Sequence, residues 1–186
     1  KLSRGLGDVY KRQGLCKFRS VKVSQLSSWP RPTTADVGLR SFAMTRARLF
    51  EETVLGMQSY LLAAPIPKDA IHHSAVWTVH VPAHDDSSGL LLVKWLEEVL
   101  FMDEVEEKWL VDCAVKIQEH EKALHLEAQV RWVESNCIEK EVEIKAVTRQ
   151  DLIVTEIDYG ETLHSPWSEV PTFEGPGWYS DVVFDI

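Results

Sequence analysis

A change in hydrophobic period at Trp109 is the feature of this chain that most limits its possible folds. From there apolar residues alternate with polar ones through residues 109–118, and again through 124–132. Strict alternation is typical of half-buried β-strands, and the polar residues 120–122 between the two stretches fit a turn. We therefore predict an antiparallel hairpin with one face on a core and the other in water.

Two helices are predicted before this hairpin. One follows Thr45, a favourable N-cap, and ends ahead of Pro65. The other covers the apolar pattern of residues 91–100, with Ser87 or Ser88 as its cap. Prolines within 29–32 exclude a helix and indicate extended or irregular chain there. Strands are predicted at 37–43, 76–81, 141–148, 152–157 and 178–186. This order favours a single α+β domain, with two helices packed on a largely antiparallel mixed sheet.

Charge divides the chain unevenly. Residues 1–31 carry a net charge of +7, whereas residues 32–186 carry −16. We interpret residues 1–29 as a basic tail and residues 30–186 as the folded domain. Residues 1–13 resemble translated adapter sequence, since the chain begins with Lys1, and they are left out of the functional interpretation. An acidic domain is poorly suited to bind a phosphate backbone directly, so sequence-specific nucleic-acid binding is not expected.

Two further classes are disfavoured. No stretch approaches the roughly 18–20 apolar residues that span a bilayer, so no membrane role is expected. The cysteines Cys16, Cys113 and Cys137 are odd in number and form no Cys-x-x-Cys pair. A disulfide framework or a cysteine zinc site is therefore not expected, and we predict a cytoplasmic location.

Two carboxylates carry the most specific chemical signal, because nucleotide-binding and hydrolase motifs are missing from the sequence. Asp36 lies where irregular chain enters a predicted strand, and Asp185 lies beside the terminal carboxylate of Ile186. Converging anions are costly unless a cation lies between them. Oxygen donors suit Ca²⁺, Mg²⁺ or Mn²⁺, so one interpretation is a divalent-cation site.

Several segments resemble the archease family in order and spacing. The strand motif Lys-Ala-Val-Thr at 145–148 and the terminal Phe-Asp-Ile at 184–186 are together the most specific. The resemblance also includes Trp178 and the segments 34–38, 49–52, 91–100, 143–148 and 182–186.

The resemblance implies a small acidic α+β protein that is not itself an enzyme. Archeases assist an RtcB-type RNA ligase in tRNA splicing or RNA repair by promoting its GTP-dependent guanylylation and its multiple turnover. By matching positions, the metal ligands would be Asp36 and Asp185, with Ile186 as a further ligand. Lys145 would be a candidate contact for the partner.

The sequence departs from the family pattern at two places. Thr33 stands where archeases usually have the histidine of His-Thr-Ala-Asp, and Arg149-Gln150 replaces the usual Tyr-His after Lys-Ala-Val-Thr. Two ring side chains near the implied site are therefore missing. A variant partner surface would follow if either histidine tunes the metal or contacts the ligase.

Three other functions remain open from the residues alone. One is a free-standing metal-dependent phosphoester hydrolase built on Asp36, Asp185 and His84. A second is an RNA-binding module that uses the basic tail. A third is a chaperone-like adaptor without metal, whose binding surface is anchored by a tryptophan: Trp29, Trp95 or Trp167.

Overall fold

The computed structural model describes residues 27–33, 36–83 and 87–186. The adapter-like segment 1–13, most of the predicted tail and His84 therefore lie outside the described residues. In chain order the elements are β1 (Ser28–Arg31), β2 (Val37–Ala43), α1 (Arg46–Leu61), β3 (His73–Pro82), α2 (Ser87–Glu104), β4 (Lys108–His120), β5 (Ala123–Glu134), a short 3₁₀ turn (Ser135–Cys137), β6 (Ala146–Ile157), β7 (Thr162–Leu163), β8 (Phe173–Glu174) and β9 (Gly177–Asp185).

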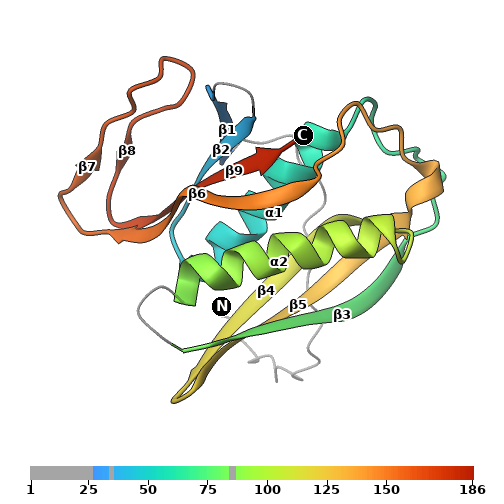
Figure 1. Ribbon diagram of the computed structural model, residues 1–186, viewed down its shortest axis with the longest axis horizontal. Coiled ribbons are helices and arrows are strands. Elements are labelled where there is room, and N and C mark those ends of the chain that lie inside the picture. Colours follow the sequence, from blue (N-terminus) through green and yellow to red (C-terminus); the bar gives the residue numbers. More distant parts are fainter. Residues whose placement is uncertain (1–26, 34–35, 84–86) are drawn as a thin grey trace, which may run out of the picture.

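The helices form a layer between two antiparallel sheets (Figure 1). One sheet has the strand order β1-β2-β9-β6, and the other has the order β3-β5-β4. Helix α1 contacts β2, β9 and β4, whereas α2 contacts β6, β3, β4 and β5. The predicted α+β class with two helices is confirmed. The strands are divided between two sheets rather than gathered in one, and β7 and β8 form a separate small ribbon.

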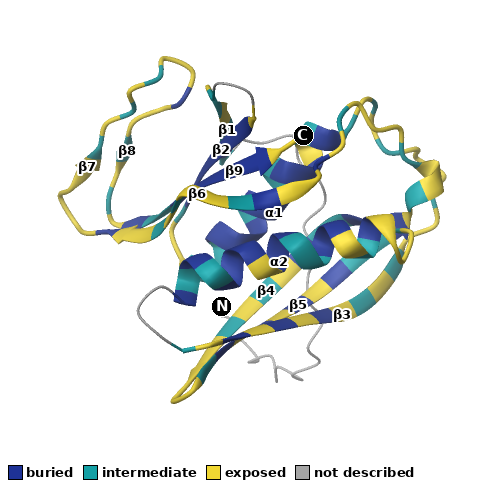
Figure 2. Ribbon diagram, viewed as in Figure 1, coloured by how far each residue is buried: buried dark blue, intermediate teal, exposed yellow. Residues whose placement is uncertain are grey.

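Each helix begins and packs as its sequence indicates. The Thr45 side chain accepts a hydrogen bond from the backbone N–H of Arg48, which confirms the predicted N-cap. Helix α2 is buried around much of its circumference because a sheet lies on each side of it (Figure 2). Its buried apolar residues are Leu91, Leu92, Val93, Trp95, Leu96, Val99 and Leu100.

The predicted hairpin is confirmed as β4 and β5. Residues 121–122 form the turn, and the last strand pair beside it is His120 with Ala123. Alternate residues of β5 are buried against the helices, whereas their neighbours face water (Figure 2). The buried set is Leu124, Leu126, Ala128 and Val130.

Extended chain was one of the two alternatives predicted for residues 29–32, whereas the prediction of two strands at 141–148 and 152–157 was wrong. Residues 28–31 form strand β1 despite Pro30, because β1 is an edge strand that pairs only with β2, where a missing N–H is tolerated. The two strands predicted at 141–148 and 152–157 are one strand, β6, which begins at Ala146. Its register shifts between Thr148 and Ile153, around Asp151 with a φ of 52°.

No helix in the described parts of the chain is long and apolar enough to cross a membrane.

Candidate functional site

The two candidate carboxylates lie at the same end of the four-stranded sheet. Asp36 directly precedes β2, and Asp185 is the last residue of β9. The last pair of the β2–β9 ladder is Val37 with Phe184, the residues that adjoin Asp36 and Asp185. Asp36 itself lies in a bend one residue outside β2, so the ladder brings the two carboxylates to the same sheet end without pairing them. Both carboxylates are exposed to water, so this sheet end presents two neighbouring acidic groups.

Backbone oxygen atoms also lie at this sheet end. Ile186 follows Asp185 and is 39% exposed. Lys145 contacts the end of β9 twice: its backbone N–H donates to the Asp185 carbonyl at 2.8 Å, and its Nζ donates to the backbone oxygen of Ile186 at 3.0 Å. The ammonium of Lys145 therefore holds the terminus in place. It would compete with a cation for that particular oxygen.

The donor set suits a hard cation. Within the described residues, no group of three or more His, Cys, Asp or Glu side chains is placed to hold a metal ion. The available donors are instead the carboxylates of Asp36 and Asp185 and the backbone oxygens beside them. Ca²⁺, Mg²⁺ and Mn²⁺ bind oxygen donors and complete their shells with water, so these residues fit such an ion.

Of the departures from the archease pattern, Thr33 lies at the same sheet end, whereas Arg149 and Gln150 lie further along β6. The Thr33 hydroxyl donates a short hydrogen bond to the Asp36 carbonyl, which ties the end of β1 to the start of β2. Arg149 and Gln150 lie in the irregular part of β6, and both are exposed. Thr33 therefore shapes the backbone at Asp36. The position of Arg149 and Gln150 leaves them free to form part of a partner surface.

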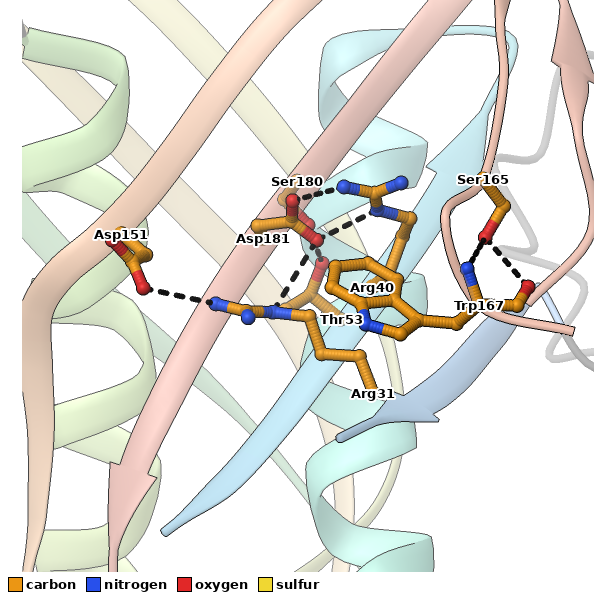
Figure 3. A network of polar contacts seen from close by, with 8 residues as sticks. All are labelled: Arg31, Arg40, Thr53, Asp151, Ser165, Trp167, Ser180 and Asp181. Atoms are coloured by element: carbon orange, nitrogen blue, oxygen red, sulfur yellow. Dashed lines mark hydrogen bonds and ion pairs between the residues drawn. The ribbon is translucent and has the colours of Figure 1, made fainter. Parts of the chain in front are cut away.

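A charged network crosses the outer face of the same sheet (Figure 3). Asp181 of β9 accepts two hydrogen bonds from the Arg40 guanidinium of β2, the one from Nε being 2.8 Å long. Arg31 of β1 approaches Asp181 with its Nε at 3.7 Å. These three side chains are at most 7% exposed. The hydrogen bond to Asp181 raises the pKa of Arg40 although burial opposes this, so Arg40 stays charged.

The loop before β8 covers this network. The Trp167 ring lies over both guanidinium groups, with Cζ of Arg40 at 4.8 Å and Cζ of Arg31 at 5.4 Å from its centre. Asp151 of the irregular part of β6 lies 4.0 Å from Arg31. The ion pair of Arg40 with Asp181 joins β2 to β9. Each of these residues is four positions from a candidate carboxylate, so the ion pair lies about 13 Å along the strands from the site.

The structure separates the other sequence candidates. Trp95 is fully buried between the two sheets, so the prediction that it could anchor a binding surface was wrong. Trp29 is half-buried with its ring centre 5.6 Å from that of Phe42, and Trp167 covers the arginines of the charged network. The sequence interpretation missed that network, because Arg40 and Asp181 meet only once the register of β2 with β9 is known.

The fold and this sheet end define an acidic α+β protein with two helices held between antiparallel sheets. The family model described as "Archease protein family (MTH1598/TM1083)" matches residues 30–186. The chain therefore belongs to the archease family. It is 26% identical over 132 residues to Protein archease of Pyrococcus abyssi, a match that covers 70% of this chain and 89% of the relative.

The fold also has a counterpart among solved structures. The solution structure of Methanobacterium thermoautotrophicum protein 1598 aligns with a TM-score of 0.57 at 21% identity. The alignment covers 87% of this chain and all of the other. This likeness supports the same fold.

Proposed function

We propose that this protein is a divalent-cation-binding accessory protein that activates an RtcB-type RNA ligase in tRNA splicing or RNA repair. It acts on its partner rather than as an enzyme, by promoting the guanylylation of the ligase with GTP and its repeated turnover. Membership of the archease family supports this proposal. We place the activity in the cytoplasm, where the free thiols of Cys113 and Cys137 would stay reduced.

The observation that carries the proposal is the register of β2 with β9. It brings Asp36 and Asp185, which are far apart in sequence, to neighbouring strand ends beside the chain terminus. Two exposed carboxylates at the same sheet end repel one another, and a divalent ion bound between them would remove this electrostatic repulsion.

The acidic sheet end would dock at the ligase's nucleotide site. GTP and RNA carry negative phosphates, so a protein surface that binds them is basic, and an acidic partner complements it. When bound, the cation would supply positive charge that stabilises a phosphoryl group during nucleotidyl transfer. Asp36 and Asp185 would position that charge, and Lys145 would hold the chain terminus beside them.

A ligation assay with limiting ligase tests the proposal. RNA ends, GTP and the partner ligase are combined with and without this protein, and product per ligase molecule is measured. We expect multiple turnovers only with the protein, and at least about tenfold less stimulation with Asp36→Asn or Asp185→Asn. Asp69→Asn, which alters an exposed acid elsewhere on the chain, is the matched control and should stimulate fully.

Two results would overturn the proposal. One is full stimulation by both Asp36→Asn and Asp185→Asn. The other is an unchanged single-turnover yield when wild-type protein is added, with ligase guanylylation followed directly by transfer of labelled nucleotide. Turnover of a phosphoester by this protein alone would instead favour the hydrolase alternative.

A further inference from the structure

Three histidines gather on the water-facing side of the three-stranded sheet. His80 of β3 and His125 of β5 are direct cross-strand partners. His120 ends β4 beside the hairpin turn, on the same face as His125, because Gln118 two residues earlier pairs with His125. All three side chains are exposed. The sequence pattern did not reveal this cluster, since its members come from three strands whose register was unknown.

The spacing of His125 from each of the other two rings is compatible with one shared ion. The ring centre of His125 is 5.6 Å from that of His80 and 5.2 Å from that of His120. A zinc–nitrogen bond of about 2 Å and a ring radius of about 1 Å put each ring centre about 3 Å from the ion. Two imidazoles at a tetrahedral angle then have centres about 5 Å apart. The two measured spacings are close to this value.

We propose that His80, His125 and His120 form a binding site for a borderline transition-metal ion, with Zn²⁺ as its occupant. As the side chains stand, no group of three or more His, Cys, Asp or Glu among the described residues could hold a metal ion, and the His80 and His125 rings lie nearly parallel at 21°. Binding therefore requires the rings to turn: at least one of His80 and His125 rotates so that their nitrogens converge on the ion, and His120 turns its ring to complete the set. Rotation about χ2 of an exposed histidine is unhindered, because that torsion is broad. Water fills the remaining position.

This site is chemically distinct from the acidic sheet end. Imidazole nitrogen suits Zn²⁺, Ni²⁺ and Cu²⁺, whereas the carboxylates of Asp36 and Asp185 suit Ca²⁺, Mg²⁺ and Mn²⁺. The two sites also lie on different sheets, on either side of the helix layer (Figure 1). One site can therefore be removed without touching the other, and neither proposal depends on the other.

Zn²⁺ titration of the untagged full-length protein against a chromophoric chelator tests the proposal. We expect one ion to bind, and binding at least about tenfold weaker with His125→Ala, because even the loss of an outer partner of a metal ligand costs 10–100-fold. His72→Ala, which removes an exposed histidine outside the cluster, should bind as the wild type does. Asp185→Asn should also leave Zn²⁺ affinity unchanged, which separates this site from the proposed function.

Imidazole nitrogen signals in NMR provide a second measurement that does not depend on a variant. Zn²⁺ should shift the signals of His80, His120 and His125 while those of His72 stay in place. Wild-type affinity in His125→Ala would overturn the proposal. So would a dissociation constant above about 1 mM for the wild type, or zinc-induced shifts confined to histidines outside the cluster.

Discussion

Replacing Asp181 with asparagine should destabilise the protein far more than the same change at Asp151. Both carboxylates face Arg31, at 3.7 Å and 4.0 Å respectively. Only Asp181 is buried, with a side chain 5% exposed against 66% for Asp151. The comparison therefore changes burial while it keeps the chemistry of the substitution the same.

The magnitude follows from the partners that remain. Asp181→Asn leaves the Arg40 guanidinium buried under Trp167 without a negative partner, and it leaves Arg31 with only the exposed Asp151 carboxylate. Breaking a buried ion pair by removing one partner costs about 3–5 kcal/mol. Since asparagine keeps one acceptor oxygen, we expect about 3 kcal/mol for Asp181→Asn. The exposed pair should be worth less than about 1 kcal/mol, and asparagine tolerates the positive φ at position 151.

Denaturant unfolding followed by far-ultraviolet circular dichroism measures both free energies. The midpoint should fall in Asp181→Asn with the slope unchanged, since the surface exposed on unfolding is the same. In a thermal scan the loss corresponds to a fall of about 6–12 °C in the midpoint. Equal costs for the two variants, or a cost below about 1 kcal/mol for Asp181→Asn, would refute the assignment of this network as the link between β2 and β9.

Three further predictions concern Cys113 and Glu51, where α1 meets β4. Burial, reinforced by the nearby charge of Glu51, raises the pKa of Cys113 well above its usual value. Iodoacetamide at pH 8 should therefore alkylate the exposed Cys137 and spare Cys113 until the protein is unfolded. Equal alkylation rates at the two cysteines would contradict this. The Cys113 thiol ionises at about pH 8.5 in the unfolded chain but only at higher pH in the folded protein. The free energy of unfolding is therefore unaffected by this thiol below about pH 8.5 and falls above it, by up to about 1.4 kcal/mol per pH unit. Cys113→Ala should remove this pH dependence. The Glu51 carboxylate accepts a hydrogen bond from the Val115 N–H at 2.8 Å. Glu51→Ala leaves that N–H unsatisfied, so it should lower the free energy of unfolding by about 2 kcal/mol and speed hydrogen exchange at Val115. Unchanged exchange protection at Val115 would show that the bond is not made.

Local sequence patterns predicted the helices and the hairpin because each depends on neighbours along the chain. Thr45 caps α1 through a residue three positions away, and the alternation after Trp109 fixes which face of β4 and β5 is buried. The division into two sheets was not predictable in this way. It depends on both helices having two apolar sides, which single-sheet packing does not require.

The candidate site was predictable only as a set of residue types. Asp36 and Asp185 were named from the sequence, but their adjacency depends on the pairing of Val37 with Phe184 across the sheet. The same limit hid the pairing of His80 with His125, since cross-strand neighbours leave no mark in a single sequence. Register is set by packing of the whole sheet, which is why the residues could be listed and their contacts could not.

Titration of Mn²⁺ into the full-length protein, followed by the electron paramagnetic resonance signal of the free ion, tests the central claim most directly. We expect one bound Mn²⁺, with affinity at least about tenfold weaker in both Asp36→Asn and Asp185→Asn and unchanged in the His125→Ala and Asp69→Asn controls. If both aspartate variants bind Mn²⁺ as tightly as the wild type, the two carboxylates do not share an ion and the account is wrong.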